Sequence, residues 1–63
     1  MPTMIDMLRI YIKGCIKYYK GVKAFYASAK DIDKAAWIEW EVANSRVELY
    51  EQLYERLGSH DKD

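Results

Sequence analysis

Hydrophobic side chains between residues 4 and 29 recur at spacings of three and four, the pattern of one face of an α-helix. A central column and its two flanking columns form this face: Leu8, Cys15, Val22 and Ala29; Met4, Tyr11, Tyr18 and Phe25; and Ile5, Ile12, Tyr19 and Tyr26. Thr3 precedes the pattern and Asp6 lies three positions later, an arrangement that resembles a capping box. The pattern predicts a helix over residues 4–29, after a lead-in of residues 1–3.

A second seven-residue repeat predicts a helix over residues 32–57. Its apolar positions alternate at spacings of four and three: Ala36, Trp40, Ala43, Val47, Tyr50, Tyr54 and Leu57. Asp31 or Asp33 can cap the start of this helix, and Gly58 stands where a left-handed C-cap would end it. We therefore expect residues 58–63 to form a polar, flexible tail.

Residues 30–31 remain as a tight turn, so we expect the helices to fold back as an antiparallel hairpin. The apolar surface is wider than one seam between two helices can cover, because a second ridge flanks the later repeat: Ala35, Val42, Leu49 and Leu53. We predict an all-α protein whose hairpins dimerise into a four-helix bundle, with a higher oligomer as the alternative. The expected oligomer interface is Leu8, Tyr11, Ile12, Cys15, Tyr18, Tyr19, Val22, Phe25, Trp40, Ala43, Val47, Tyr50 and Tyr54.

Two glycines, Gly14 and Gly21, lie beside the tyrosine column of the first helix and lower its helix propensity. They can make room for neighbouring rings or for a close helix crossing. The alternative is that they open a groove for a ligand or peptide.

The chain has 63 residues, one cysteine and one histidine, His60. It can form no internal disulfide and has too few Cys and His ligands for a closed zinc site, so self-association is the expected source of added stability. We expect no metal and no cofactor. A basic leader and an apolar run of roughly 18–20 residues are both missing, so we expect a cytoplasmic location and no membrane association.

The two halves of the chain carry opposite charge although the net charge is zero. Residues 1–30 have six basic residues against one acid, and residues 31–63 have four against nine. One interpretation is that a basic helix lies beside an acidic one. The other is that the basic residues form a nucleic-acid face: Arg9, Lys13, Lys17, Lys20 and Lys23.

Three large apolar residues, Ile10, Trp37 and Ile38, lie away from the predicted seams and are a candidate patch for a partner protein. Glu39 and Arg46 fall inside the apolar arc of the second helix. They are either rim positions with their ends in solvent or a pair across the dimer that sets its register. Cys15 is expected to be a buried small hydrophobe.

The segments Asp31–Asp33 (DID) and Glu48–Gly58 (ELYEQLYERLG), with the size of the chain, resemble the repressor of primer family of plasmid copy-number regulators. The resemblance implies a hairpin that dimerises into a four-helix bundle and binds RNA through its first helices. The first helix here has the lysines of such a face but no Asn or Gln.

No combination of nucleophile, base and oxyanion donors is evident, so we expect no enzyme activity. The expected function is that of an adaptor, inhibitor or regulator, of the kind that phages and plasmids encode, which binds a larger protein as a homodimer. The alternative is a regulator that binds RNA or DNA.

Overall fold

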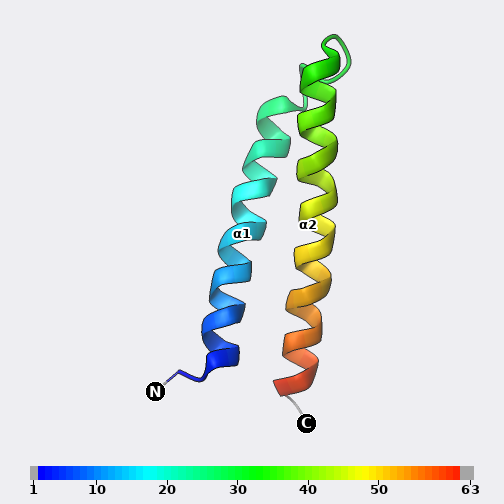
Figure 1. The fold of residues 1–63 in the computed structure, drawn as a ribbon. Helices are drawn as coiled ribbons and strands as arrows, with labels where there is room; N and C mark the ends of the chain where they lie inside the picture. The colour runs from blue at the N-terminus through cyan, green and yellow to red at the C-terminus, as the bar shows by residue number, and fades with distance from the viewer. Residues whose placement is uncertain (1, 62–63) are drawn as a thin grey trace.

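The computed structural model describes the backbone of residues 2–61 and the side chains of residues 2–58. Two helices, α1 (Met4–Tyr26) and α2 (Lys34–Asp61), pack against each other in antiparallel directions, with both chain ends at the same end of the molecule (Figure 1). This confirms the predicted all-helical hairpin.

Helix α1 begins with the capping box that the sequence indicates. The Asp6 amide donates to Thr3 Oγ1 at 3.1 Å, and the Thr3 amide donates to Asp6 Oδ2 at 3.1 Å. Because each residue satisfies an amide that the first turn leaves unpaired, the start of α1 is locally determined.

The connection is longer than the predicted turn at residues 30–31. Helix α1 ends at Tyr26, three residues before the predicted end, and consecutive turns follow over residues 27–32. The Lys30 amide donates to the Tyr26 carbonyl at 3.0 Å, and the Asp33 amide donates to the Ala29 carbonyl at 3.0 Å. These turn bonds satisfy backbone groups that a continuing helix would otherwise pair.

Helix α2 begins at Lys34, two residues after the predicted start at residue 32. It is capped by Asp33, one of the two predicted candidates, whose Oδ1 accepts from the Ala35 amide at 3.0 Å. The helix continues through Gly58 to Asp61, which corrects the predicted end at residue 57 and the flexible tail for residues 58–61. Gly58 lacks the positive φ that a left-handed C-cap requires. Residues 1, 62 and 63, included in the predicted lead-in and tail, lie outside the described residues.

The core of the hairpin is a narrow seam. Among the described side chains, the buried hydrophobic ones are Ile12, Ala36, Ala43 and Val47. The hairpin is one layer of helices thick, with extents of 47 × 19 × 12 Å. Its radius of gyration of 14.5 Å exceeds the roughly 10.6 Å expected of a compact domain of this length.

The seam on α1 centres on the column of Ile12 and not on the predicted column of Leu8, which is 46% exposed. The reason lies on the basic side of α1. The Arg9 guanidinium lies 4.9 Å from the Tyr54 ring centre, and the Lys23 ammonium lies 5.6 Å from the Trp40 ring centre. These long side chains cover the aromatic rings of α2 with their charged ends and aliphatic stems, and so widen the seam toward the basic side.

Candidate interaction surfaces

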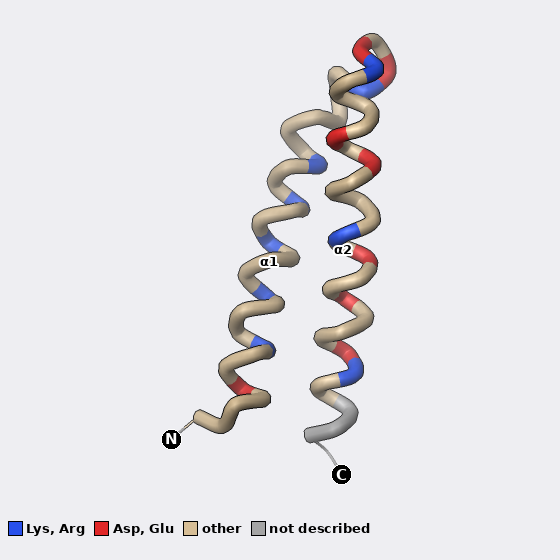
Figure 2. The backbone as a smooth tube through the Cα atoms, viewed as in Figure 1, with Lys and Arg blue, Asp and Glu red and all other residues tan. Residues whose placement is uncertain are grey.

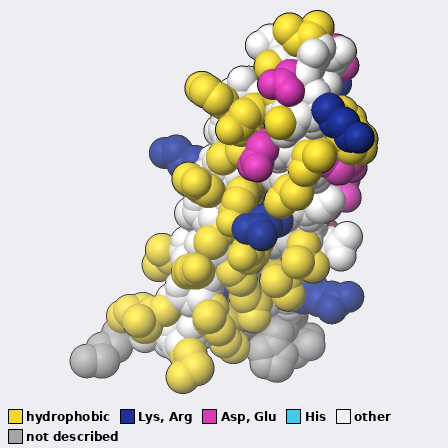
Figure 3. Space-filling model, turned by 45° about the horizontal axis from the view of Figure 1, so that its top comes forward, with side chains coloured by type: hydrophobic (Ala, Val, Ile, Leu, Met, Phe, Trp, Pro, Cys, Tyr) yellow, Lys and Arg dark blue, Asp and Glu magenta, His cyan; other side chains and the backbone are white. Residues whose placement is uncertain are grey.

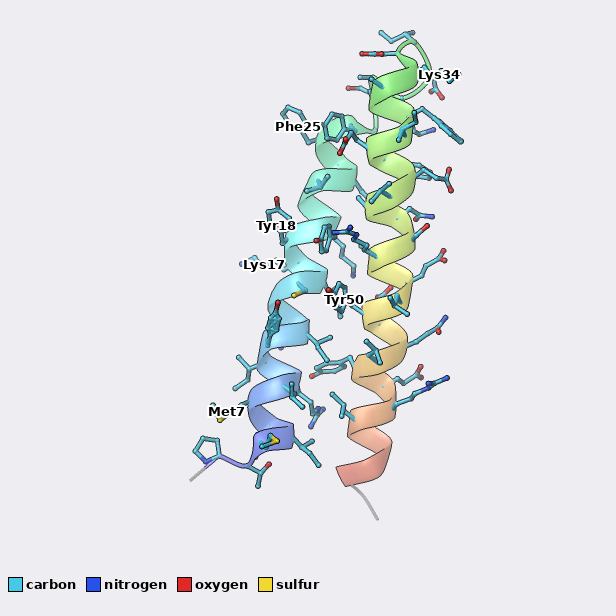
Figure 4. All side chains as sticks on the ribbon, in the orientation of Figure 1. Met7, Lys17, Tyr18, Phe25, Lys34 and Tyr50 are labelled. Atoms are coloured by element: carbon cyan, nitrogen blue, oxygen red, sulfur yellow. The ribbon has the colours of Figure 1, made fainter. Side chains whose placement is uncertain are left out.

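The side of the hairpin away from these basic residues carries exposed hydrophobic side chains from both helices. We call it the apolar face and define it by the exposed Leu8, Tyr11, Tyr18 and Phe25 of α1 and Val42, Leu49 and Leu53 of α2, with the half-buried Val22 of α1 beside them. Figure 3 shows hydrophobic side chains spread over both helices on one side of the molecule, with few charged groups among them. In Figure 4, Tyr18 and Phe25 point away from α2, whereas Tyr50 lies between the helices.

An open hollow of about 380 Å³ near the middle of the apolar face shows that the two sets of side chains share one side. It is lined by Tyr18, Tyr19, Val22, Glu39, Val42, Ala43 and Arg46. The two helices therefore direct an apolar flank to the same side of the seam. Glu39 and Arg46 stand within that flank, as the sequence predicted.

Arg46 is held by the aromatic groups of the seam. Its Nη1 donates to the Tyr19 hydroxyl at 2.7 Å, and its guanidinium carbon lies 5.3 Å from the Tyr19 ring centre. The Tyr19 ring stacks on Tyr50 at 6.0 Å between ring centres. The hydrogen bond to Tyr19 is the main cause that raises the pKa of Arg46 above its ordinary value. The sequence contains no local signal for this contact, because it joins residues 27 positions apart.

The predicted oligomer interface divides into three groups by burial. Ile12, Ala43 and Val47 are buried within a single hairpin and have little surface to offer a second chain. A second group is half-buried along the seam: Cys15, Tyr19, Val22, Trp40, Tyr50 and Tyr54. The third group, Leu8, Tyr11, Tyr18 and Phe25, is exposed and belongs to the apolar face.

Cys15 is half-buried beside this exposed group and is a free thiol, whereas the sequence predicted a buried side chain. A hydrogen bond with Cys15 is the main cause that raises the pKa of the exposed Tyr11 hydroxyl. The contact joins residues one helical turn apart and is local in origin.

The glycines of α1 do not accommodate a neighbour within the hairpin. A Cβ atom built on Gly14 or Gly21 would have no other atom within 4 Å, outside the local helix backbone. The room that the sequence assigned to adjacent rings is therefore open space in a single chain.

The opposite side of the seam is polar. Figure 2 shows basic residues along α1 and mainly acidic ones along α2. Lys20 Nζ lies 3.7 Å from Glu51 Oε2, and both side chains are more than half exposed. Lys30 joins Lys23 at Trp40, with its ammonium 5.0 Å from the ring centre. These contacts favour the interpretation that a basic helix lies beside an acidic one.

The predicted nucleic-acid face is therefore not a uniform exposed patch. Arg9, Lys20 and Lys23 contact Tyr54, Glu51 and Trp40 of α2, respectively. Lys13 lines an open hollow of about 340 Å³ with Asp6, Arg9, Ile10 and Tyr54, and Lys17 is exposed.

The three residues of the predicted partner patch are not brought together. Ile10 lies beside Tyr54, near the open end of the hairpin. Trp37 and Ile38 lie in the first turns of α2, at the other end of a molecule that is 47 Å long. Trp37 is 46% exposed and Ile38 is 45% exposed. Of the three predicted residues, these two can belong to one patch near the turn.

Neither described helix has an apolar stretch of sufficient length to cross a membrane. The described side chains include no cluster of three or more His, Cys, Asp or Glu residues suited to a metal ion. Comparisons with protein-family models, curated proteins and solved structures found no match to the chain.

Proposed function

We propose that this chain is a non-enzymatic helical interaction protein that works as a homodimer, with two hairpins packed through their apolar faces into a four-helix bundle. The observation that carries the proposal is the apolar face, to which both helices contribute and on which Phe25 is 75% exposed and Tyr18 is 65% exposed. Large apolar side chains that are exposed together on one face are typical of interaction sites.

The area of the hairpin supports a second copy as the occupant of this face. The chain exposes 5134 Å², whereas a compact monomer of 7.5 kDa exposes about 4,250 Å². The difference, about 900 Å², is close to the roughly 800 Å² that each partner buries in a standard interface. A second hairpin also carries the same apolar flanks as the surface it would cover.

The biological role that we propose is binding to a larger protein, as an adaptor, inhibitor or regulator. Trp37 and Ile38 at the turn end supply exposed apolar surface outside the apolar face, and tryptophan is common in binding hot spots. The contacts of Arg9, Lys20 and Lys23 with α2 count against the alternative of an RNA- or DNA-binding face.

The first test is the native mass of the purified protein by size exclusion with light scattering, with absorbance read at 260 and 280 nm. We expect twice the mass of the 7.5 kDa chain and a protein-like absorbance ratio. A monomer at all concentrations would contradict the proposal. Nucleic acid that co-purifies at low salt, and is lost with Lys13→Glu and Lys17→Glu, would favour the alternative.

A further inference from the structure

Glu39 and Arg46 are opposite charges one heptad apart within the apolar flank of α2. Such a pair is self-complementary. When two copies of α2 approach antiparallel about a two-fold axis midway between the two residues, Glu39 of each copy faces Arg46 of the other. The axis would then pass close to Val42 and Ala43, which line the hollow between the two charges.

Helix α1 carries a matching pair at the same level. Tyr18 and Phe25 are also one heptad apart, and they are the two most exposed rings of the apolar face. The contact of Tyr19 with Arg46, and that of Lys23 with Trp40, place their midpoint beside the midpoint of Glu39 and Arg46. One axis therefore sets Tyr18 of one copy against Phe25 of the other, as it exchanges the two charges.

The same axis accounts for a third exposed residue. Ile32, in the connecting segment, is 88% exposed in the single chain. It precedes α2 by two residues and, counted along the sequence, is as many residues from the midpoint of Glu39 and Arg46 as Leu53 is on the other side. In the dimer it would reach the level of Tyr11 and Leu53 of the second copy, which are both exposed in the hairpin.

We infer that two copies of this chain pair through their apolar faces about a two-fold axis near Val22 and Val42, held in register by two reciprocal Glu39–Arg46 ion pairs and two Tyr18–Phe25 ring contacts. This inference rests on the proposed homodimer and specifies its geometry. The alignment is offset toward the turn, so Met4 and Leu8 of each copy extend beyond the region of overlap.

The charge pairing is tested by a cycle of Glu39→Arg, Arg46→Glu and the double exchange, with the dimer Kd measured by sedimentation. Each single reversal creates like charges at both reciprocal sites and is expected to raise Kd by about tenfold or more, and the double exchange to restore it within about threefold. Glu48→Arg with Lys17→Glu is the matched control away from the apolar face and should leave Kd unchanged. Because Arg46 also binds Tyr19, Glu39→Arg carries the test if Arg46→Glu loses helicity.

The position of the axis is tested by cysteine cross-linking under mild oxidation. In a Cys15→Ser background, Val42→Cys is expected to form a disulfide-linked dimer, because the two positions lie within about one residue of the axis. The Leu49 positions of the two copies would be about 20 Å apart along α2, too far for a disulfide, so Leu49→Cys is the control.

The outcomes separate the two proposals. A wild-type monomer would overturn both the homodimer and this pairing. If the wild type is a dimer but the double exchange raises Kd by the combined effect of the two single reversals, the offset pairing is wrong although the bundle stands. The same conclusion follows if native Cys15 or Leu49→Cys forms the cross-link in place of Val42→Cys. Restoration by the double exchange together with cross-linking at Val42→Cys supports the inference.

Discussion

The two sides of the hairpin flank the same seam and differ in how their side chains are used within one chain. On the polar side, Lys20 and Lys23 reach across to Glu51 and Trp40 of the other helix. On the apolar face, Tyr18 and Phe25 point away from α2 and are mostly exposed. The comparison teaches that the side chains of the polar side find partners within one hairpin, whereas those of the apolar face remain exposed in a single chain.

The largest effect is expected in the seam that both sides share. Ile12→Ala removes part of a buried side chain and should lower the free energy of unfolding by about 2–5 kcal/mol, enough to unfold a domain of this size. Circular dichroism during urea titration measures it. Ile10→Ala, at a position 71% exposed on the same helix, is the control and should change stability by less than about 0.5 kcal/mol.

A charge on the apolar face should separate assembly from folding. Val42→Asp is expected to raise the dimer Kd about tenfold or more, equivalent to about 1.4 kcal/mol, because the carboxylate would lose water within the interface and would compete with Glu39 for Arg46. Light scattering measures the mass, and circular dichroism should still show a helical chain. Ser45→Asp adds the same charge at an exposed position outside the apolar face and should leave the dimer intact. Equal effects of the two substitutions would contradict the distinction between the two sides.

The open space at the glycines predicts a gain in stability. Gly14→Ala or Gly21→Ala should raise the free energy of unfolding by about 0.5–1 kcal/mol, because alanine restricts the unfolded chain and meets no atom within 4 Å in the hairpin. Thermal melts would show a higher Tm. If Tm falls and the dimer dissociates, the glycines are instead the site of a close crossing between chains.

The exposed ion pair of the polar side should contribute least. Lys20→Ala is expected to lower stability by less than about 1 kcal/mol, and salt should diminish the difference, because both partners are more than half exposed. Urea melts at low and high salt measure it, with Lys17→Ala as the control. A fall of several kcal/mol in the free energy of unfolding would contradict the prediction that this exposed ion pair contributes little to stability.

A small pH effect is expected at the edge of the apolar face. The pKa of Tyr11 is raised above its usual 10.0, chiefly by its hydrogen bond with Cys15, so the fold favours the protonated phenol. The protonated Tyr11 hydroxyl therefore stabilises the fold fully below pH 10.0, and this stabilisation is lost as pH rises through the higher pKa of the folded state. Absorbance titration at 295 nm, compared between wild type and Tyr11→Phe, should place Tyr11 above 10.0, and Cys15→Ala should lower that midpoint.

Local patterns were sufficient for the two helices and for the start of α1, whereas α2 begins at Lys34, two residues after its predicted start. The capping box of Thr3 and Asp6, and the cap at Asp33, depend on residues within three positions of each other. The ends of the helices were harder to predict. Gly58 is compatible with both a C-cap and a helix interior. In the structure it lies inside α2, where Arg9 Nη2 would be 3.6 Å from a Cβ atom added to this glycine.

The division of the wide apolar arc between seam and surface could not be predicted from spacing. The sequence placed Arg9 and Lys23 in a candidate nucleic-acid face, because charged residues on a helix usually face water. In the hairpin they lie on Tyr54 and Trp40, and the seam is displaced toward them. Spacing also placed Ile10 with Trp37 and Ile38, although the antiparallel fold sets Ile10 near the opposite end.

The amino-acid sequence alone determined the helical periodicity, the N-terminal caps and the breadth of the apolar surface, because these follow from side chains within a few residues of one another. It also determined the antiparallel hairpin, because a connection of residues 27–33 is short beside helices of 23 and 28 residues. Only the tertiary structure decided which columns are buried between the helices and which are left exposed. That choice depends on how side chains from two distant segments pack together. Here the basic side chains of α1 pack on aromatic rings of α2, and Tyr18 and Phe25 are left exposed outside the seam.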